Sequence, residues 1–172
     1  MGRELAWVCA ILPREYATRV KRLCTHANRG IGLSEKVFAF PLHISLKKSF
    51  MTDSFPEVRE ALTDYFRKRG PFEIEVGHLI RHEGMLWLEV VPAGGLLQVH
   101  DEIDALLESR FGIPRHRFDR HFEPHISLFT DRDPRKIDDM YEAIVDEFEP
   151  QRVTVRRIVV GAERERDTFL EL

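Results

Sequence analysis

Four residues, His-Ile-Ser-Leu, occur twice in this chain, beginning at His43 and at His125. Each copy follows a proline and alternates apolar with polar residues, which is typical of a β-strand. Successive side chains of a strand point to opposite faces, so His43 shares a face with Ser45, and His125 shares one with Ser127. The sequence therefore predicts two strands that each bury an isoleucine and a leucine and each present a histidine with a serine.

The two copies belong to a longer internal duplication. Each half of the chain follows the order strand, helix, histidine strand, helix, strand. The strands that end the halves also align, because Pro71 and Pro150 both precede alternating sequences that open a hairpin. Equivalent halves arranged about a pseudo-twofold axis would bring the two histidine strands together near that axis. We therefore expect His43 and His125 to face one another.

Hydrophobic periodicity predicts the remaining elements. Four amphipathic helices are expected where apolar residues recur every three or four positions. Residues 31–39 have no clear pattern and are expected to lead, as a loop, into the first histidine strand. The apolar stripes of the helices run from Tyr16 to Ala27, Val58 to Phe66, Leu96 to Phe111 and Ile137 to Phe148, and strands are expected at 5–12, 40–48, 72–76, 85–91, 123–130, 153–160 and 168–172.

The doubled motif (histidine, any residue, serine or threonine, then an apolar residue) resembles the signature of the two-histidine (2H) phosphoesterases. That family includes LigT-like 2′-5′ RNA ligases and cyclic nucleotide phosphodiesterases. The resemblance implies a bilobal, duplicated α+β fold, in which two antiparallel sheets flanked by about four helices are pseudo-twofold symmetric around a central cleft. The lobes of the family interleave along the sequence, so residues 1–172 are expected to form a single domain. The resemblance also implies catalytic roles for His43 and His125, and phosphate binding by Ser45 and Ser127.

Two imidazoles are suited to opening a cyclic phosphate without a metal or a nucleophilic side chain. The pKa of an imidazole is about 6.5, so one ring can be neutral while the other is protonated. The neutral ring would take a proton from water, and the protonated ring would give one to the departing ribose oxygen, each worth about 10²–10⁴ in rate. Ser45 and Ser127 would donate hydrogen bonds to the phosphate oxygens. The symmetry leaves the two roles open, and our working assignment makes His43 the acid and His125 the base.

Basic and aromatic residues close to the motifs have two interpretations each. Continued alternation would place Lys47 and Phe129 on the histidine face, where the lysine could contact phosphate and the ring could stack on a base. The alternatives are a solvated lysine and a core phenylalanine. The loop with Arg115, Arg117 and Arg120 is the most basic in the chain. It would steer an anionic substrate, or it is simply a solvated loop.

Composition narrows the partners and the compartment. The formal net charge of −3 argues against a field that would hold long duplex nucleic acid, whereas a small nucleotide or an RNA end remains compatible. Cys9 and Cys24 form no CxxC or zinc spacing, which suggests a reducing compartment. The apolar run at residues 6–12 is too short for a signal peptide or a membrane span. We therefore expect a cytoplasmic protein without a membrane partner, and the oligomeric state stays open.

The remaining histidines predict no metal centre. His116 and His121 precede His125, yet the chain has no HExxH motif and no cysteine at ligand spacing. We therefore expect no metal and no other cofactor. Four further histidines are interpreted as structural or exposed, namely His26, His78, His82 and His100.

The sequence thus favours a metal-independent phosphodiesterase that hydrolyses a 2′,3′-cyclic nucleotide-like phosphate or a 2′-5′ phosphodiester. The same chemistry run backwards, with a ribose hydroxyl in place of water, would make a 2′-5′ RNA ligase. A non-catalytic module that binds RNA ends would keep the fold without turnover. A purely structural domain would not bring the two histidines together.

Overall fold

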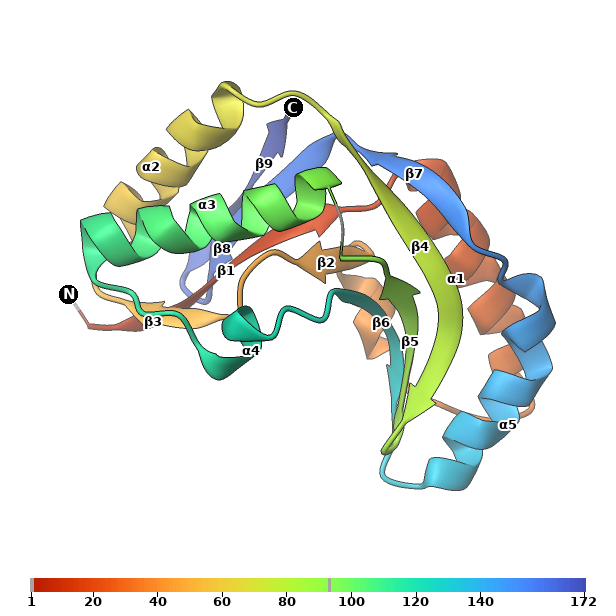
Figure 1. Cartoon of the computed structure of the whole chain (residues 1–172). Coiled ribbons are helices and arrows are strands. Elements are labelled where there is room, and N and C mark those ends of the chain that lie inside the picture. The colour runs from red at the N-terminus through yellow and green to blue at the C-terminus, as the bar shows by residue number, and fades with distance from the viewer. Residues whose placement is uncertain (1, 93) are drawn as a thin grey trace.

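The computed structural model describes residues 2–92 and 94–172, which form two antiparallel sheets, five α-helices and two short 3-10 helices (Figure 1). The elements from the N-terminus are β1 (Glu4–Ile11), α1 (Arg14–Asn28), η1 (Lys36–Ala39), β2 (His43–Ser45), β3 (Phe50–Thr52), α2 (Phe55–Arg67), β4 (Phe72–His82) and β5 (Met85–Val90). They continue with α3 (Gly94–Phe111), α4 (Arg117–Arg120), β6 (His125–Thr130), α5 (Pro134–Ile144), η2 (Val145–Glu147), β7 (Gln151–Val155), β8 (Arg157–Ala162) and β9 (Glu165–Glu171).

Both sheets have a histidine strand at one edge. Sheet A has the order β2-β1-β8-β9, with β3 also paired to β1, and sheet B has the order β6-β5-β4-β7. The halves exchange strands: β8 from the second half pairs with β1, and β4 from the first half pairs with β5, the first strand of the second half. This equivalence of the two sheets is the duplicated α+β arrangement that the repeated motif predicted.

Helices cover one face of each sheet. α2 packs on β8 and β9 with α3 beside it, while α5 packs on β4 and β5 with α1 beside it (Figure 1). In β1, Ala6, Val8 and Ala10 are buried in the main core, whereas Cys9 and Ile11 belong to a smaller apolar cluster on the opposite face. The histidine strands therefore border a sheet face that the helices leave uncovered. No helix within the described ranges combines the length and the apolar character needed to cross a membrane.

Several features differ from the sequence prediction, including the 3-10 helix η1 inside the expected loop at residues 31–39. The expected strand at 153–160 is two strands, because the chain passes from sheet B to sheet A at Arg156, between β7 and β8. Alternating apolar residues fit either sheet, so the pattern does not reveal the change. The first histidine strand is limited to residues 43–45 and is followed by the unpredicted strand β3. Part of the expected basic loop forms the one-turn helix α4, which makes a fifth helix.

Candidate active site

The two histidine strands meet where the edges of the two sheets approach one another. β2 and β6 are in contact although they belong to different sheets (Figure 1). The isoleucine and leucine of both motifs are fully buried. Both motif serines and His125 are exposed, and His43 is half-buried. The structure therefore places all four predicted site residues on the open side of these edge strands.

Each histidine ring is held in the same way by its own strand. His43 Nδ1 lies 2.9 Å from the carbonyl oxygen of Pro41, and His125 Nδ1 lies 2.9 Å from that of Glu123. A carbonyl oxygen only accepts hydrogen bonds, so Nδ1–H is the donor in both rings. This leaves Nε2 of each ring as the atom that can exchange a proton with a substrate.

His43 has apolar neighbours. Phe40 packs edge-on against it with 5.1 Å between ring centroids, and Ile11 lies directly across from it in the β1–β2 register. Burial lowers the pKa of His43, the hydrogen bond to Pro41 opposes that shift, and the charge of His125 lowers the pKa further. The two rings are therefore within electrostatic reach of one another.

His125 has an aromatic and an acidic neighbour instead. The Trp87 ring lies against it with centroids 4.9 Å apart and planes inclined by 33°. Glu89 is directly across from His125 in the β5–β6 register, so the two side chains share a face. A Cβ at Gly77 would come within 2.6 Å of Glu89 Oε2, so the glycine leaves room for this carboxylate. The environments of the two histidines thus differ although their strands are equivalent.

A small apolar cluster lies on the sheet face beside His43. Cys9 lies across from Ser45 and clusters with Ile11 and Val159. Burial raises the pKa of Cys9 to about 12, although a hydrogen bond with Ser45 acts to lower it. The thiol therefore stays protonated near neutral pH and is not a nucleophile.

Lys47 does not reach the histidine face. Strand β2 ends at Ser45, so the alternation on which the prediction relied stops there. The lysine is 2% exposed, and its Nζ lies 2.6 Å from Asp104 Oδ1 and 2.9 Å from Asp119 Oδ2. The predicted contact with phosphate is wrong, and so is the alternative of a solvated lysine. The side chain is a buried structural cation.

Asp119 is the centre of this buried network. Its carboxylate also accepts hydrogen bonds from the backbone N–H groups of Lys48 and His116, each at 2.8 Å. Burial alone would raise the pKa of Asp119, but these N–H groups and the Lys47 ammonium hold it below its usual value of 3.8. The network ties the end of the first motif to the segment that leads into the second.

His100 is structural, as expected. Its Nδ1 lies 2.8 Å from the carbonyl oxygen of Leu46, and its Nε2 lies 2.9 Å from that of Asp119. The ring also stacks on Phe122 with centroids 3.8 Å apart. The buried imidazole thus reinforces the same link between the two motif segments.

Phe129 is a core residue. It is 1% exposed and packs edge-on against Phe38 with centroids 5.4 Å apart. Leu86 lies opposite Phe129 but Trp87 lies opposite Ser127, so β6 has one extra residue at this point. Such a β-bulge breaks the alternation of faces. The predicted base-stacking role is therefore wrong, and the core interpretation is confirmed.

The basic loop is only partly available to a substrate. Arg115 Nη2 lies 2.6 Å from Asp101 Oδ1 and its Nε lies 2.8 Å from Asp104 Oδ2, so this guanidinium is paired internally. Arg117 lies over the Phe118 ring, which is 52% exposed. Arg120 is exposed on α4. The expectation of anion steering therefore rests on Arg117 and Arg120.

The aromatic neighbours of the histidines were missed by the sequence analysis. One signal was available for Phe40, which precedes His43 by three residues as Phe122 precedes His125, although Phe122 stacks on His100 in the fold. Trp87 and Glu89 had no such signal, since only the β5–β6 register places them beside the second motif.

Among the described residues, no three His, Cys, Asp or Glu side chains are grouped so that they could hold a metal ion.

Comparisons with known proteins agree with this architecture. The sequence profile of the 2′-5′ RNA ligase superfamily matches residues 14–167. No curated protein sequence matches the chain. Three similar solved structures are E. coli LigT complexed with phosphate (16% identity, covering 100% of this chain and 96% of that one, TM-score 0.61), TT0787 of Thermus thermophilus (18%, 98% and 94%, 0.63) and Kluyveromyces marxianus Usb1 (12%, 98% and 98%, 0.59). At these identities the likeness to solved structures shows the fold, and it confirms the predicted fold class.

Proposed function

This chain belongs to the 2′-5′ RNA ligase superfamily of 2H phosphoesterases, and on that basis we propose that it is a metal-independent phosphodiesterase. Its reaction would be hydrolysis of a 2′,3′-cyclic nucleotide-like phosphate or of a 2′-5′ phosphodiester. The observation that carries the proposal is the pair of histidines on contacting edge strands. Both have Nδ1 bound to a backbone carbonyl and Nε2 left for proton transfer.

Two proton transfers accompany one substitution at phosphorus in this proposal. Neutral His43 takes a proton from water as the water oxygen bonds to phosphorus. Protonated His125 gives a proton to the ribose oxygen as its bond to phosphorus breaks. Each transfer would contribute about 10²–10⁴ in rate. The products are a ribose hydroxyl and a phosphate monoester when the substrate is cyclic.

The environments of the rings favour this division of roles, which reverses our working assignment from the sequence. The lowered pKa of His43 keeps it neutral, as a base must be. Glu89 lies across from His125 in the β5–β6 register, whereas the apolar Ile11 lies across from His43. Ser45 and Ser127 are exposed two residues beyond the histidines and would donate hydrogen bonds to the non-bridging phosphate oxygens.

The test is turnover of 2′,3′-cyclic nucleotides in excess chelator, with wild type and with His43→Ala and His125→Ala. Activity that survives chelation but is lost in both variants supports the proposal, whereas loss on chelation points to a metal-dependent hydrolase. The superfamily description also favours the reverse reaction as a second candidate. Joining of tRNA halves through a 2′-5′ bond would identify a ligase.

A further inference from the structure

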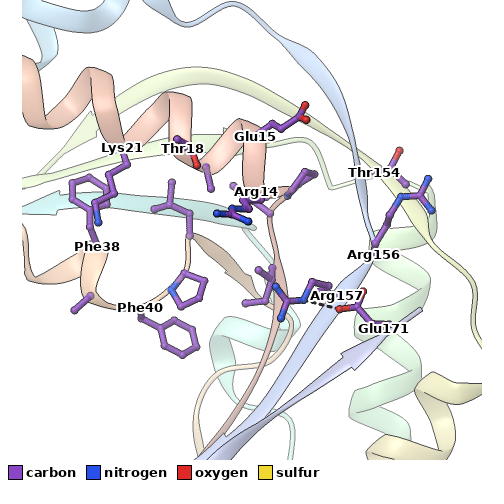
Figure 2. Close-up of a pocket in the computed structure, with 17 residues that line it drawn as sticks. Arg14, Glu15, Thr18, Lys21, Phe38, Phe40, Thr154, Arg156, Arg157 and Glu171 are labelled. Atoms are coloured by element: carbon purple, nitrogen blue, oxygen red, sulfur yellow. Dashed lines mark ion pairs between the residues drawn. The ribbon is translucent and has the colours of Figure 1, made fainter.

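A pocket of about 850 Å³ lies next to the residues that surround His43, and Figure 2 shows the side chains that line it. Three residues around this histidine also line the pocket. Phe40 packs against the His43 ring, the Pro41 carbonyl accepts the hydrogen bond from Nδ1, and Ile11 lies across from His43 in the β1–β2 register. The pocket and the histidine therefore share a wall.

The pocket differs in charge from the chain as a whole. The full sequence has a formal net charge of −3, yet the basic side chains around the pocket outnumber the acidic ones. Such a local reversal of sign attracts anions into a concave site. The charged residues that line it are Arg14, Lys21, Arg156 and Arg157 against Glu15 and Glu171.

One face of α1 supplies two of these cations. Arg14, Thr18 and Lys21 follow one another at helical spacing, so they share a face, and all three line the pocket. Figure 2 shows the head groups of Arg14 and Lys21 directed toward the pocket. Neither has a hydrogen bond or an ion pair with another described residue. Their charges are therefore available to a ligand.

Arg157 approaches from sheet A. It lies opposite Ile11, which lies opposite His43, so the three side chains share one face of the sheet. Two strand spacings separate Arg157 from His43, roughly 10 Å. Its Nε lies 2.8 Å from Glu171 Oε1, and the arginine side chain is 47% exposed (Figure 2). An anion bound at Arg157 would therefore lie about one nucleoside away from the phosphate that reacts at the histidines.

We propose that this pocket binds a second phosphate of the substrate, through Arg14, Lys21 and Arg157. The inference rests on the proposed function and deepens it. The preferred substrate then has a cyclic or 2′-5′ linked phosphate at the histidines and a further phosphate one unit away. The phosphodiester of an RNA end and the pyrophosphate of an ADP-ribose cyclic phosphate both offer that chemistry, whereas a cyclic mononucleotide does not.

The test uses two matched substrates. One is a dinucleotide that ends in a 2′,3′-cyclic phosphate, and the other has an uncharged methylphosphonate in place of its internal phosphodiester. Wild type should favour the charged form by about tenfold in kcat/KM, as expected for one charge-assisted hydrogen bond. The double variant Arg14→Ala, Lys21→Ala should bring that ratio close to one. Arg135→Ala, which removes a positive charge from an exposed side chain on α5 away from the pocket, should keep it.

Equal turnover of the two dinucleotides by wild type, or an unchanged ratio in the double variant, would overturn the proposal. Direct binding to the His125→Ala variant separates this inference from the proposed activity. Tighter binding of the charged dinucleotide, lost when Arg14 and Lys21 are also replaced, supports the pocket even if no substrate is turned over. Absence of turnover counts only against the proposed function. A parallel measurement with ADP-ribose cyclic phosphate shows whether the substrate with a phosphodiester or the one with a pyrophosphate loses more kcat/KM in the double variant.

Discussion

The Lys47 ammonium lies 2.9 Å from the Asp119 carboxylate, and this contact joins the end of the first motif strand to the segment that leads into the second. Asp119 also accepts the backbone N–H of Lys48, and Asp104 binds the same ammonium. The two motif strands belong to different sheets, so no β-ladder joins them directly. A buried ion-pair network therefore helps to set the distance between the proposed catalytic groups.

Replacement of Lys47 by alanine should destabilise the fold strongly. It leaves the buried carboxylates of Asp104 and Asp119 without their shared cation, which typically costs about 3–5 kcal/mol. The free energy of unfolding in urea measures the loss. Lys48→Ala is the matched control, because that side chain is exposed and its removal should change stability by less than about 0.5 kcal/mol. Equal stability of the two variants would contradict a structural role for Lys47.

Replacement of either motif histidine by alanine should abolish most activity without unfolding the protein. Each variant loses one proton transfer, so kcat should fall by about 10²–10⁴. The rings are exposed or half-buried, so the melting temperature should change little. His26→Ala, at an exposed position on α1, is the control that should retain full activity. A loss limited to one of the two variants would mean that the motifs do not act as a pair.

At both motif serines, alanine should lower kcat and threonine should not. Ser45→Ala and Ser127→Ala each remove one donor to the phosphate oxygens, and kcat should fall by about 10- to 1,000-fold. Ser→Thr keeps the hydroxyl and should restore most of the rate. A hydroxyl that only fills space would give the same kcat with alanine as with threonine, which is the outcome that excludes phosphate binding.

The rise of kcat/KM on the acidic side of the pH profile should have its midpoint below the usual pKa of histidine. Burial disfavours the charged imidazole and lowers the pKa of His43, so the ring stays neutral to a lower pH. A base is active when neutral, so kcat/KM should rise through a midpoint below 6.5. Phe40→Ala exposes the ring and should move that midpoint upward. A midpoint at or above 6.5 in wild type would exclude His43 as the base.

The sequence was sufficient for features that depend on local alternation. The two motifs, their shared faces and the duplicated order of elements all follow from residues close together in the chain. Lys47 and Phe129 were placed wrongly because the strand ends after Ser45 and a bulge interrupts β6. Both events depend on pairing with partner strands, which residue periodicity does not reveal.

Sequence periodicity also predicts only part of the pocket lining. The spacing of Arg14 and Lys21 on one helix face can be read from the sequence. The approach of Arg157 cannot, because it depends on the pairing of β8 with β1 from the opposite end of the chain. The change of sheet at Arg156 brings these distant segments together, and alternation alone gives no sign of it.

The exchange of strands between the halves has a consequence for biosynthesis. When β1 leaves the ribosome it can pair with β2 and β3, but its other edge must wait for β8, which is made more than a hundred residues later. A nascent chain stopped before Arg157 would present an open β edge flanked by apolar residues, a template for aggregation. Prompt completion or protection by a chaperone would therefore matter more for this chain than for one that builds each sheet from neighbouring segments.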